Sequence, residues 1–106
     1  MRTKTQIDGS YINTWVFPGN LFFHGRTPIA QSGMSIDPQS ANIDEVLVSR
    51  DYQGRGIGTS LVRRCLKLAR RFGCRFVELS PAEGKESFYE QFGFYRYGRK
   101  MRYDLN

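Results

Sequence analysis

The residues best suited to chemistry in this chain form a short glycine-rich loop, Gln53-Gly54-Arg55-Gly56-Ile57-Gly58. It follows an aliphatic run with β-branched Val46 and Val48 and precedes a basic segment. Glycines at this density let the backbone approach a bulky charged group, since they lack a Cβ and tolerate positive φ. The first-turn amides of a helix lack partners within it, and the helix dipole adds about half a positive charge there. The loop therefore favours a phosphate or pyrophosphate as its ligand.

Two familiar phosphate motifs do not fit this loop. A P-loop needs Gly-Lys-Ser/Thr after its second glycine, and the dinucleotide fingerprint has an acidic residue about 20 residues further on. Neither feature has a match here. Thr59 and Ser60 stand where first-turn hydroxyls can join the amides in binding phosphate. Gln53 and Arg55 are the candidates for side-chain contacts to the same group.

The composition predicts that residues 1–106 form one domain, because 40% hydrophobic and 14% aromatic residues are enough for a packed core. The net charge of +6 suits an anionic partner without identifying it. No apolar run approaches a membrane span, and no signal-peptide pattern is present. We therefore expect a cytoplasmic protein without membrane contact. Cys65 and Cys74 lack metal-site spacing and are expected to be reduced core thiols.

The first half of the chain reads as strands joined by short connections. A polar connection over residues 37–42 is expected before the strand that leads into the glycine loop. The connections are too short for a crossover helix, so we expect antiparallel pairing. His24, the only histidine, lies beside a turn and is interpreted as a loop residue. The predicted strands are residues 11–17, 21–24, 29–36 and 43–49.

A helix is predicted from Ile57 to Phe72. Its apolar residues are spaced four, four, three and four apart, which places them on one helical face: Ile57, Leu61, Cys65, Leu68 and Phe72. Gly73 is the expected C-cap. The basic residues on the other faces are interpreted as a solvated surface that the helix dipole favours. Binding of a nucleic-acid backbone is the less favoured interpretation.

The second half of the chain continues the alternation of strand and helix. A short strand over residues 75–79 would lie parallel to the strand before the loop, because such crossovers are right-handed. A short helix is predicted over residues 85–91. The two-residue period over residues 95–105, interrupted at Gly98, predicts a final hairpin.

Two motifs together resemble the GNAT family of acetyl-CoA-dependent N-acetyltransferases. The glycine loop resembles the Gln/Arg-x-x-Gly-x-Gly/Ala pyrophosphate signature of that family. Phe88-Tyr89, followed by Gly93-Phe94, resembles its Phe-Tyr-x-x-x-Gly-Phe element. The resemblance is strong over residues 44–94 and implies acetyl-CoA as cofactor. The residues it assigns to cofactor binding in the loop and helix start are Gln53, Gly54, Arg55, Gly56, Ile57, Gly58, Thr59 and Ser60.

Further cofactor contacts are implied by the same resemblance. The backbone of Leu47, Val48 and Ser49 would hydrogen-bond the pantetheine arm of CoA like an added strand. Many family members carry an Asn at the start of the second helix that contacts the cofactor, but this chain has none there. Ser87 and Lys85 are the candidates to replace it.

The resemblance also implies two catalytic roles. Tyr89, carried over as the general acid, would protonate the departing thiolate. Glu45 is the candidate general base, because many members place an acidic residue at this position of the strand. If Val46 and Val48 point into the core, Glu45 points toward the groove, whereas its neighbour Asp44 is expected on the opposite face.

We therefore expect an α/β (α+β) fold: a GNAT-like, mixed, mainly antiparallel sheet of six or seven strands with two principal helices. A full GNAT domain has two helices between its first two strands, and residues 18–20 leave no room for this N-terminal helix pair. The acceptor would be a primary amine of a protein or small molecule. Either a large acceptor brings its own surface or a second subunit closes the groove, and a homodimer is compatible with both. The alternative is a non-catalytic GNAT-fold module that binds CoA or a protein partner, and nucleic-acid binding is least favoured.

Overall fold

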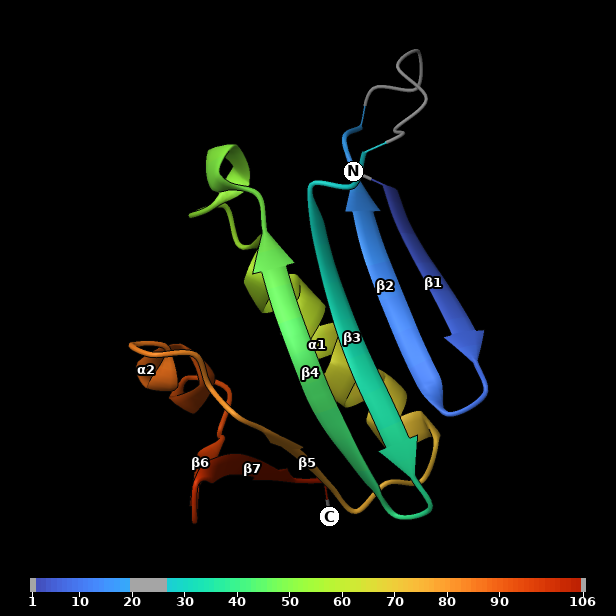
Figure 1. Cartoon of the computed structure of the whole chain (residues 1–106), viewed down its shortest axis with the longest axis vertical. Coiled ribbons are helices and arrows are strands. Elements are labelled where there is room, and N and C mark those ends of the chain that lie inside the picture. Colours follow the sequence, from blue (N-terminus) through green and yellow to red (C-terminus); the bar gives the residue numbers. More distant parts are fainter. Residues whose placement is uncertain (1, 20–26, 106) are drawn as a thin grey trace.

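A computed structural model of the protein describes residues 2–19 and 27–105, and in these ranges seven strands form one mixed sheet (Figure 1). The strand order is β1-β2-β3-β4-β5-β7-β6, and only β4 and β5 pair in parallel. The strands are β1 (Arg2–Asp8), β2 (Tyr11–Phe17), β3 (Ala30–Asp37), β4 (Ser40–Val48), β5 (Phe76–Leu79), β6 (Tyr95–Tyr97) and β7 (Lys100–Asp104). The helices are α1 (Ile57–Arg71) and α2 (Glu86–Glu90), with a 3-10 turn at Arg50–Tyr52. The predicted fold class, including the parallel pair and the final hairpin, is confirmed.

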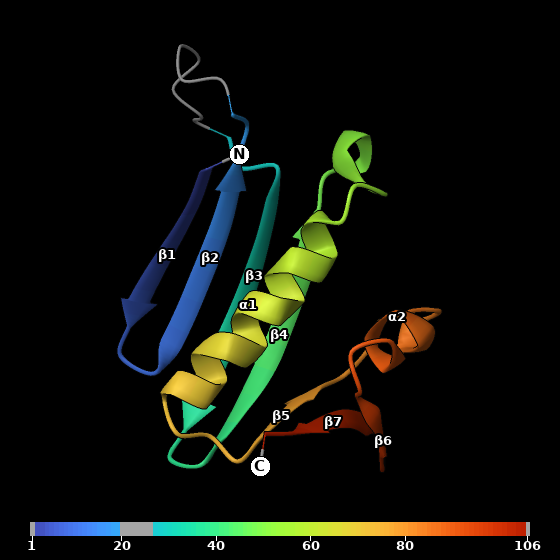
Figure 2. The same cartoon turned by 180° about the vertical axis from the view of Figure 1, so that it is seen from behind.

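Helix α1 covers one face of the sheet (Figure 2). The side chains that it buries against the strands include Leu61, Val62 and Cys65. It ends where predicted, because Gly73 adopts a positive φ of 79°. Phe72 differs from the expectation for the apolar face, since it lies beyond the last helical residue and is 47% exposed.

The hydrophobic core lies between α1 and the strands. Its fully buried side chains include Met34 on β3, Val62 on α1 and Val77 on β5. Cys65 and Cys74 are free thiols buried in the same cluster, as predicted. The core therefore holds α1 against the parallel strands β4 and β5.

The N-terminal strand β1 was not predicted from the sequence. Its residues are almost all exposed, so it carries no alternation of apolar and polar residues to reveal it. Only Gly9 and Ser10 separate β1 from β2, so no helix lies between the first two strands of the described residues. The strand predicted over residues 21–24 lies outside the described residues.

Strand β4 is longer than predicted. It begins at Ser40, so the expected polar connection shrinks to a tight turn at Pro38 and Gln39. No helix in the described ranges covers the face of β1–β4 opposite α1, which we call the open face (Figure 1). Within those ranges, no helix has the length and apolar character needed to cross a membrane.

Candidate active site

A cavity of about 540 Å³ lies between β4, the glycine loop and α2. Strand β4 pairs with β5 over a short stretch, in which Ser40–Ile43 face Phe76–Leu79, and the two strands then diverge (Figure 1). The cavity lies where they have separated. Most of the residues expected to bind cofactor line this cavity: Leu47, Val48, Gln53, Gly54, Gly56, Ile57, Gly58, Thr59 and Tyr89. Lys85, a candidate to replace the missing Asn, also lines it.

The edge of β4 offers backbone groups to this cavity. Ser49 N–H donates to the Ile29 carbonyl (2.7 Å) beside the Ala30–Val48 pair, so Val48 turns its own N–H and carbonyl away from β3. Val46 lies two residues earlier in the same register and faces the same way. The backbone groups available for an added strand are therefore the N–H and carbonyl of Val46 and the N–H of Val48, because the Val48 carbonyl accepts from the Gln53 side chain.

The contacts expected from the backbone of Leu47 and Ser49 need correction. Alternation along the ladder turns the backbone of Leu47 toward β3. Ser49 has both backbone groups occupied, because its carbonyl also accepts from Tyr52 N–H (2.9 Å). The side chain of Leu47 lines the cavity, but Ser49 does not.

The glycine loop builds an anion site at the start of α1. Gly54 and Gly56 have φ of 77° and 83°, which L-residues with a Cβ rarely adopt. Gly56 caps α1 without a side-chain hydrogen bond, and the first turn carries no acidic residue. The amides of Ile57, Gly58 and Thr59 precede the first intrahelical bond, from Ser60 N–H to Gly56 O, and so remain available to an anion.

The polar side chains of the loop stabilise the loop itself. Gln53 Nε2 donates to the Val48 carbonyl (3.1 Å), which ties the loop to the end of β4. The Arg55 guanidinium lies over the Tyr52 ring, 5.0 Å from its centroid. Arg55, Ser60 and Ser87 do not line the cavity, although each was expected to contact the cofactor.

Four lining residues were not assigned from the sequence: Val46, Tyr52, Ala82 and Phe88. Phe88 belongs to the Phe-Tyr motif, but the sequence assigned it no contact with the cofactor. Tyr52 lines the cavity because the 3-10 turn changes the direction of the chain after β4. No residue pattern in the sequence predicts such a turn.

Tyr89 contributes a phenol to the inner wall of the cavity. Its ring packs edge-on against Phe88 and Phe94, with centroids 5.0 and 5.8 Å apart. The Tyr89 side chain is buried. Among the described residues, every fully buried side-chain oxygen has a hydrogen-bond partner, so the Tyr89 hydroxyl is not both buried and unpaired. Burial, with a smaller effect of Cys65, raises the pKa of Tyr89, so the phenol keeps its proton at neutral pH.

A β-bulge places the two carboxylates of β4 on the same side of the sheet. The register shifts between Gly33–Glu45 and Met34–Ile43, so Asp44 is the extra residue. Asp44 Oδ1 accepts from Asn42 Nδ2 (2.7 Å), and Asn42 lies on the open face. The expectation that Asp44 and Glu45 occupy opposite faces is therefore wrong, because the bulge breaks the simple alternation.

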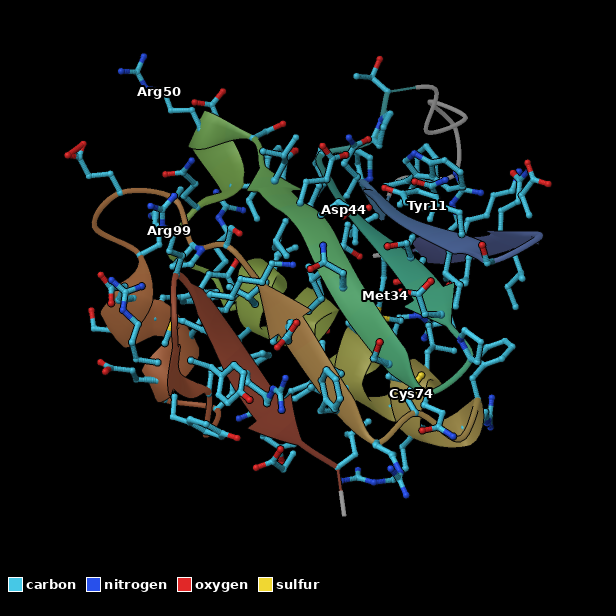
Figure 3. The ribbon with its side chains drawn as sticks, turned by 60° about the horizontal axis from the view of Figure 1, so that its bottom comes forward. Tyr11, Met34, Asp44, Arg50, Cys74 and Arg99 are labelled. Atoms are coloured by element: carbon cyan, nitrogen blue, oxygen red, sulfur yellow. The ribbon has the colours of Figure 1, made fainter. Side chains whose placement is uncertain are left out.

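Glu45 and Asp44 have separate partners on the open face. Glu45 Oε2 accepts from Gln31 Nε2 on β3 (2.7 Å), and Glu45 is outside the cavity lining. Burial first, and a hydrogen bond to Asp44 second, raise the pKa of Tyr11. Tyr11 lies across Gly33, where a Cβ would collide with its hydroxyl, and Figure 3 shows Tyr11 and Asp44 beside one another.

Comparison with known proteins decides the family. The sequence model described as the Acetyltransferase (GNAT) family matches residues 7–94. The chain belongs to the GNAT family. Glucosamine 6-phosphate N-acetyltransferase of Trypanosoma brucei brucei is 38% identical over 64 residues, which are 60% of this chain and 44% of that protein. N-alpha-acetyltransferase 30 of Schizosaccharomyces pombe is 37% identical over 62 residues, covering 56% and 41% of the two chains.

Solved acetyltransferase structures share the fold. A Bacillus cereus acetyltransferase superimposes with a TM-score of 0.80 at 18% identity, covering 90% of this chain and 73% of that one. A GNAT family N-acetyltransferase of Escherichia coli, YhbS, solved in complex with CoA, gives a TM-score of 0.72 at 19% identity and covers 90% and 59%. The match to each of the two curated relatives spans less than half of that relative's length. Among the described residues, no three His, Cys, Asp or Glu side chains gather as a metal site.

Proposed function

We propose that the protein is an acetyl-CoA-dependent N-acetyltransferase that transfers the acetyl group directly to a primary amine of a protein or small molecule. One observation carries the proposal: a single cavity contains the free amides at the start of α1, the free Val46 backbone and Val48 N–H at the edge of β4, and the Tyr89 phenol. An anion site, a strand-like edge and a proton donor suit the pyrophosphate, the pantetheine arm and the sulfur of CoA in turn.

Acetyl-CoA supplies the acetyl group as a thioester. The α1 amides of Ile57 to Thr59 would hold the pyrophosphate, with the Lys85 ammonium group beside the same cavity. The Val46 and Val48 backbone would align the pantetheine arm.

The proton transfers fall to two side chains. As the amine nitrogen bonds to the acetyl carbon and the carbon–sulfur bond breaks, Tyr89 donates its phenolic proton to the sulfur. Glu45 takes the proton that the amine loses, directly or through water. Gln31 holds one carboxylate oxygen of Glu45 at 2.7 Å, which leaves the other oxygen for this role.

The acceptor would approach from the open face. In the described ranges, no helix stands over Asp44 and Glu45, so a wide acceptor such as a protein segment can reach β4. The names of the two relatives indicate different acceptors, glucosamine 6-phosphate for one and an α-amine for the other. We propose a cytoplasmic location as well, because Cys65 and Cys74 are free thiols.

The proposal is tested by incubating the protein with acetyl-CoA and a panel of amines. The panel contains glucosamine 6-phosphate, free lysine and peptides with a free α-amine or an internal lysine, and release of CoA is followed with a thiol reagent. The buried Cys65 and Cys74 keep the background low. Acceptor-dependent thiol release supports the proposal. Tight CoA binding without release for any acceptor supports a non-catalytic CoA-binding module instead.

A further inference from the structure

The outer edge of β1 forms a long docking surface. Among the residues that the structure describes, β1 pairs with β2 alone and stands at the edge of the sheet. Its sequence, RTKTQID, contains no Pro, its seven residue pairs run without a bulge, and nearly every side chain is exposed. Proteins usually protect edges with short strands, Pro, bulges or charged side chains, and of these β1 has only charged side chains, at Arg2, Lys4 and Asp8. A straight seven-residue edge is a template for another strand.

The groups at this edge follow from the β1–β2 turn. Only two residues separate Asp8 from Tyr11, so these two form a hydrogen-bonded pair. Successive residues of a strand direct their backbone N–H and carbonyl groups to opposite sides. The backbone groups of the even-numbered residues of β1 therefore face β2. The N–H and carbonyl groups of Thr3, Thr5 and Ile7 point outward, and no residue in ranges 2–19 and 27–105 pairs with them.

We propose that β1 pairs antiparallel with β1 of a second copy of this chain, about a two-fold axis at Thr5, and so joins two sheets into one. In this register Thr5 faces Thr5 of the partner subunit, and Thr3 faces Ile7 of the partner subunit. Arg2 stands directly opposite Asp8 of the partner subunit at both ends. All three outward-facing residues gain hydrogen-bonded partners.

Charge selects this register over its neighbours. Sliding the partner by two residues one way brings Lys4 against Lys4 of the partner subunit, and like charges directly opposite are destabilising. Sliding it the other way leaves Arg2 and Thr3 unpaired. The register centred on Thr5 pairs all seven residues, opposes two Arg–Asp pairs and opposes no like charges.

Side-chain contacts on the helix side support a preformed edge. Arg64 Nε on α1 donates to Thr5 Oγ1 (2.9 Å), and Thr5 Oγ1 lies 3.2 Å from Thr14 Oγ1 on β2. These bonds hold the centre of β1 in place although its side chains are exposed. Ile7 is 53% exposed at the same edge, and pairing would cover it with Thr3 of the partner subunit.

The proposed dimer leaves both cavities open. The cavity lies at β4, on the far side of β2 and β3 from β1. A partner at β1 therefore does not close the acceptor groove, which distinguishes this interface from a second subunit that completes the site. Acetyl transfer per subunit should be the same for monomer and dimer.

Sedimentation of the full chain over a concentration series tests the proposal. The wild-type protein should be dimeric, and Arg2→Asp or Asp8→Arg alone should each raise the dimer dissociation constant about tenfold or more, since two like-charge contacts form per dimer. The double variant, Arg2→Asp with Asp8→Arg, should restore it. Arg99→Asp makes the same charge change in the β6–β7 turn and should leave association unchanged.

A proline variant provides a second test. Thr3→Pro removes an outward N–H and leaves the β1–β2 ladder intact, so it should give a folded monomer with unchanged acetyl transfer per subunit. A monomeric wild-type protein overturns the proposal. So does a dimer that persists in Thr3→Pro and ignores both charge reversals, because its interface then lies elsewhere. Neither result depends on whether the protein transfers acetyl groups.

Discussion

The Phe88 ring on α2 packs against Gly58 at the start of α1, with its Cζ 3.5 Å from the point that a Cβ would occupy on Gly58. Val48 Cγ2 on β4 stands 3.7 Å from the same point. Gly58 thus lies where strand, loop and second helix meet. The two motifs that suggested the family from the sequence are in direct contact, and they surround one cavity.

Alanine at Gly56 and at Gly58 should have different effects. Gly56 has a positive φ of 83°, so a Cβ there should destabilise the loop by about 1–2 kcal/mol and weaken CoA binding about tenfold. A Cβ on Gly58 makes ordinary contacts, and the gain in helix propensity offsets any strain. Calorimetry with CoA and chemical denaturation measure both effects. Equal losses in the two variants would contradict the account of the loop.

Replacing Tyr89 by Phe removes the proposed acid and keeps the ring contacts with Phe88 and Phe94. We expect kcat to fall about 100-fold, with CoA affinity and stability nearly unchanged. Steady-state kinetics beside a CoA titration separates the two effects. A Tyr89→Phe protein with the wild-type kcat would remove the assigned role.

The two neighbouring carboxylates of β4 offer a matched comparison. Glu45→Gln should lower kcat by about 100-fold or more, because the amide cannot accept the amine proton. Asp44→Asn should change kcat little, because Asp44 bonds Asn42 and Tyr11 rather than the acceptor. Rates with a saturating acceptor measure the difference. An Asp44→Asn protein with the larger loss would reverse the assignment.

Cys65 should make stability fall at alkaline pH. Burial raises the pKa of its thiol from 9.0 to about 11. Below pH 9 the thiol is protonated in both the folded and the unfolded state, so its full contribution to the free energy of unfolding is present. Between pH 9 and about 11 only the unfolded state loses the proton, so the free energy of unfolding falls by about 1.4 kcal/mol per pH unit.

Chemical denaturation at several pH values, with Cys65→Ala as the control, measures this contribution. The variant should have a shallower decline than the wild-type protein between pH 9 and about 11. Parallel declines would show that the folded protein does not resist ionisation of this thiol.

The elements with strong periodicity could be predicted from the sequence. The apolar face of α1 and the Gly73 that follows it predicted the bounds of that helix closely. Both are local sequence features, and the apolar face is the one that packs on the core. The two motifs located the cavity, since their chemistry depends on residue type. β1 was missed because Ile7 is the one apolar residue in RTKTQID, and only the pairing of this segment with β2 makes it a strand.

The details that depend on register were beyond the sequence. The bulge at Asp44 changes which face the following residues occupy, and no spacing of residues announces it. Which backbone groups remain free was equally hidden. Ser49 is occupied because a 3-10 turn and β3 both use it, whereas Val46 is free because β5 diverges from β4.

The central claim is that the cavity between β4, the glycine loop and α2 binds CoA through its pyrophosphate and pantetheine arm. Calorimetric titration of the full chain with CoA and with pantetheine tests it most directly. We predict saturable binding of CoA and at least about 100-fold weaker binding of pantetheine, because the latter lacks the anion that the start of α1 would hold. No binding of CoA, or equal affinity for the two ligands, would contradict the claim.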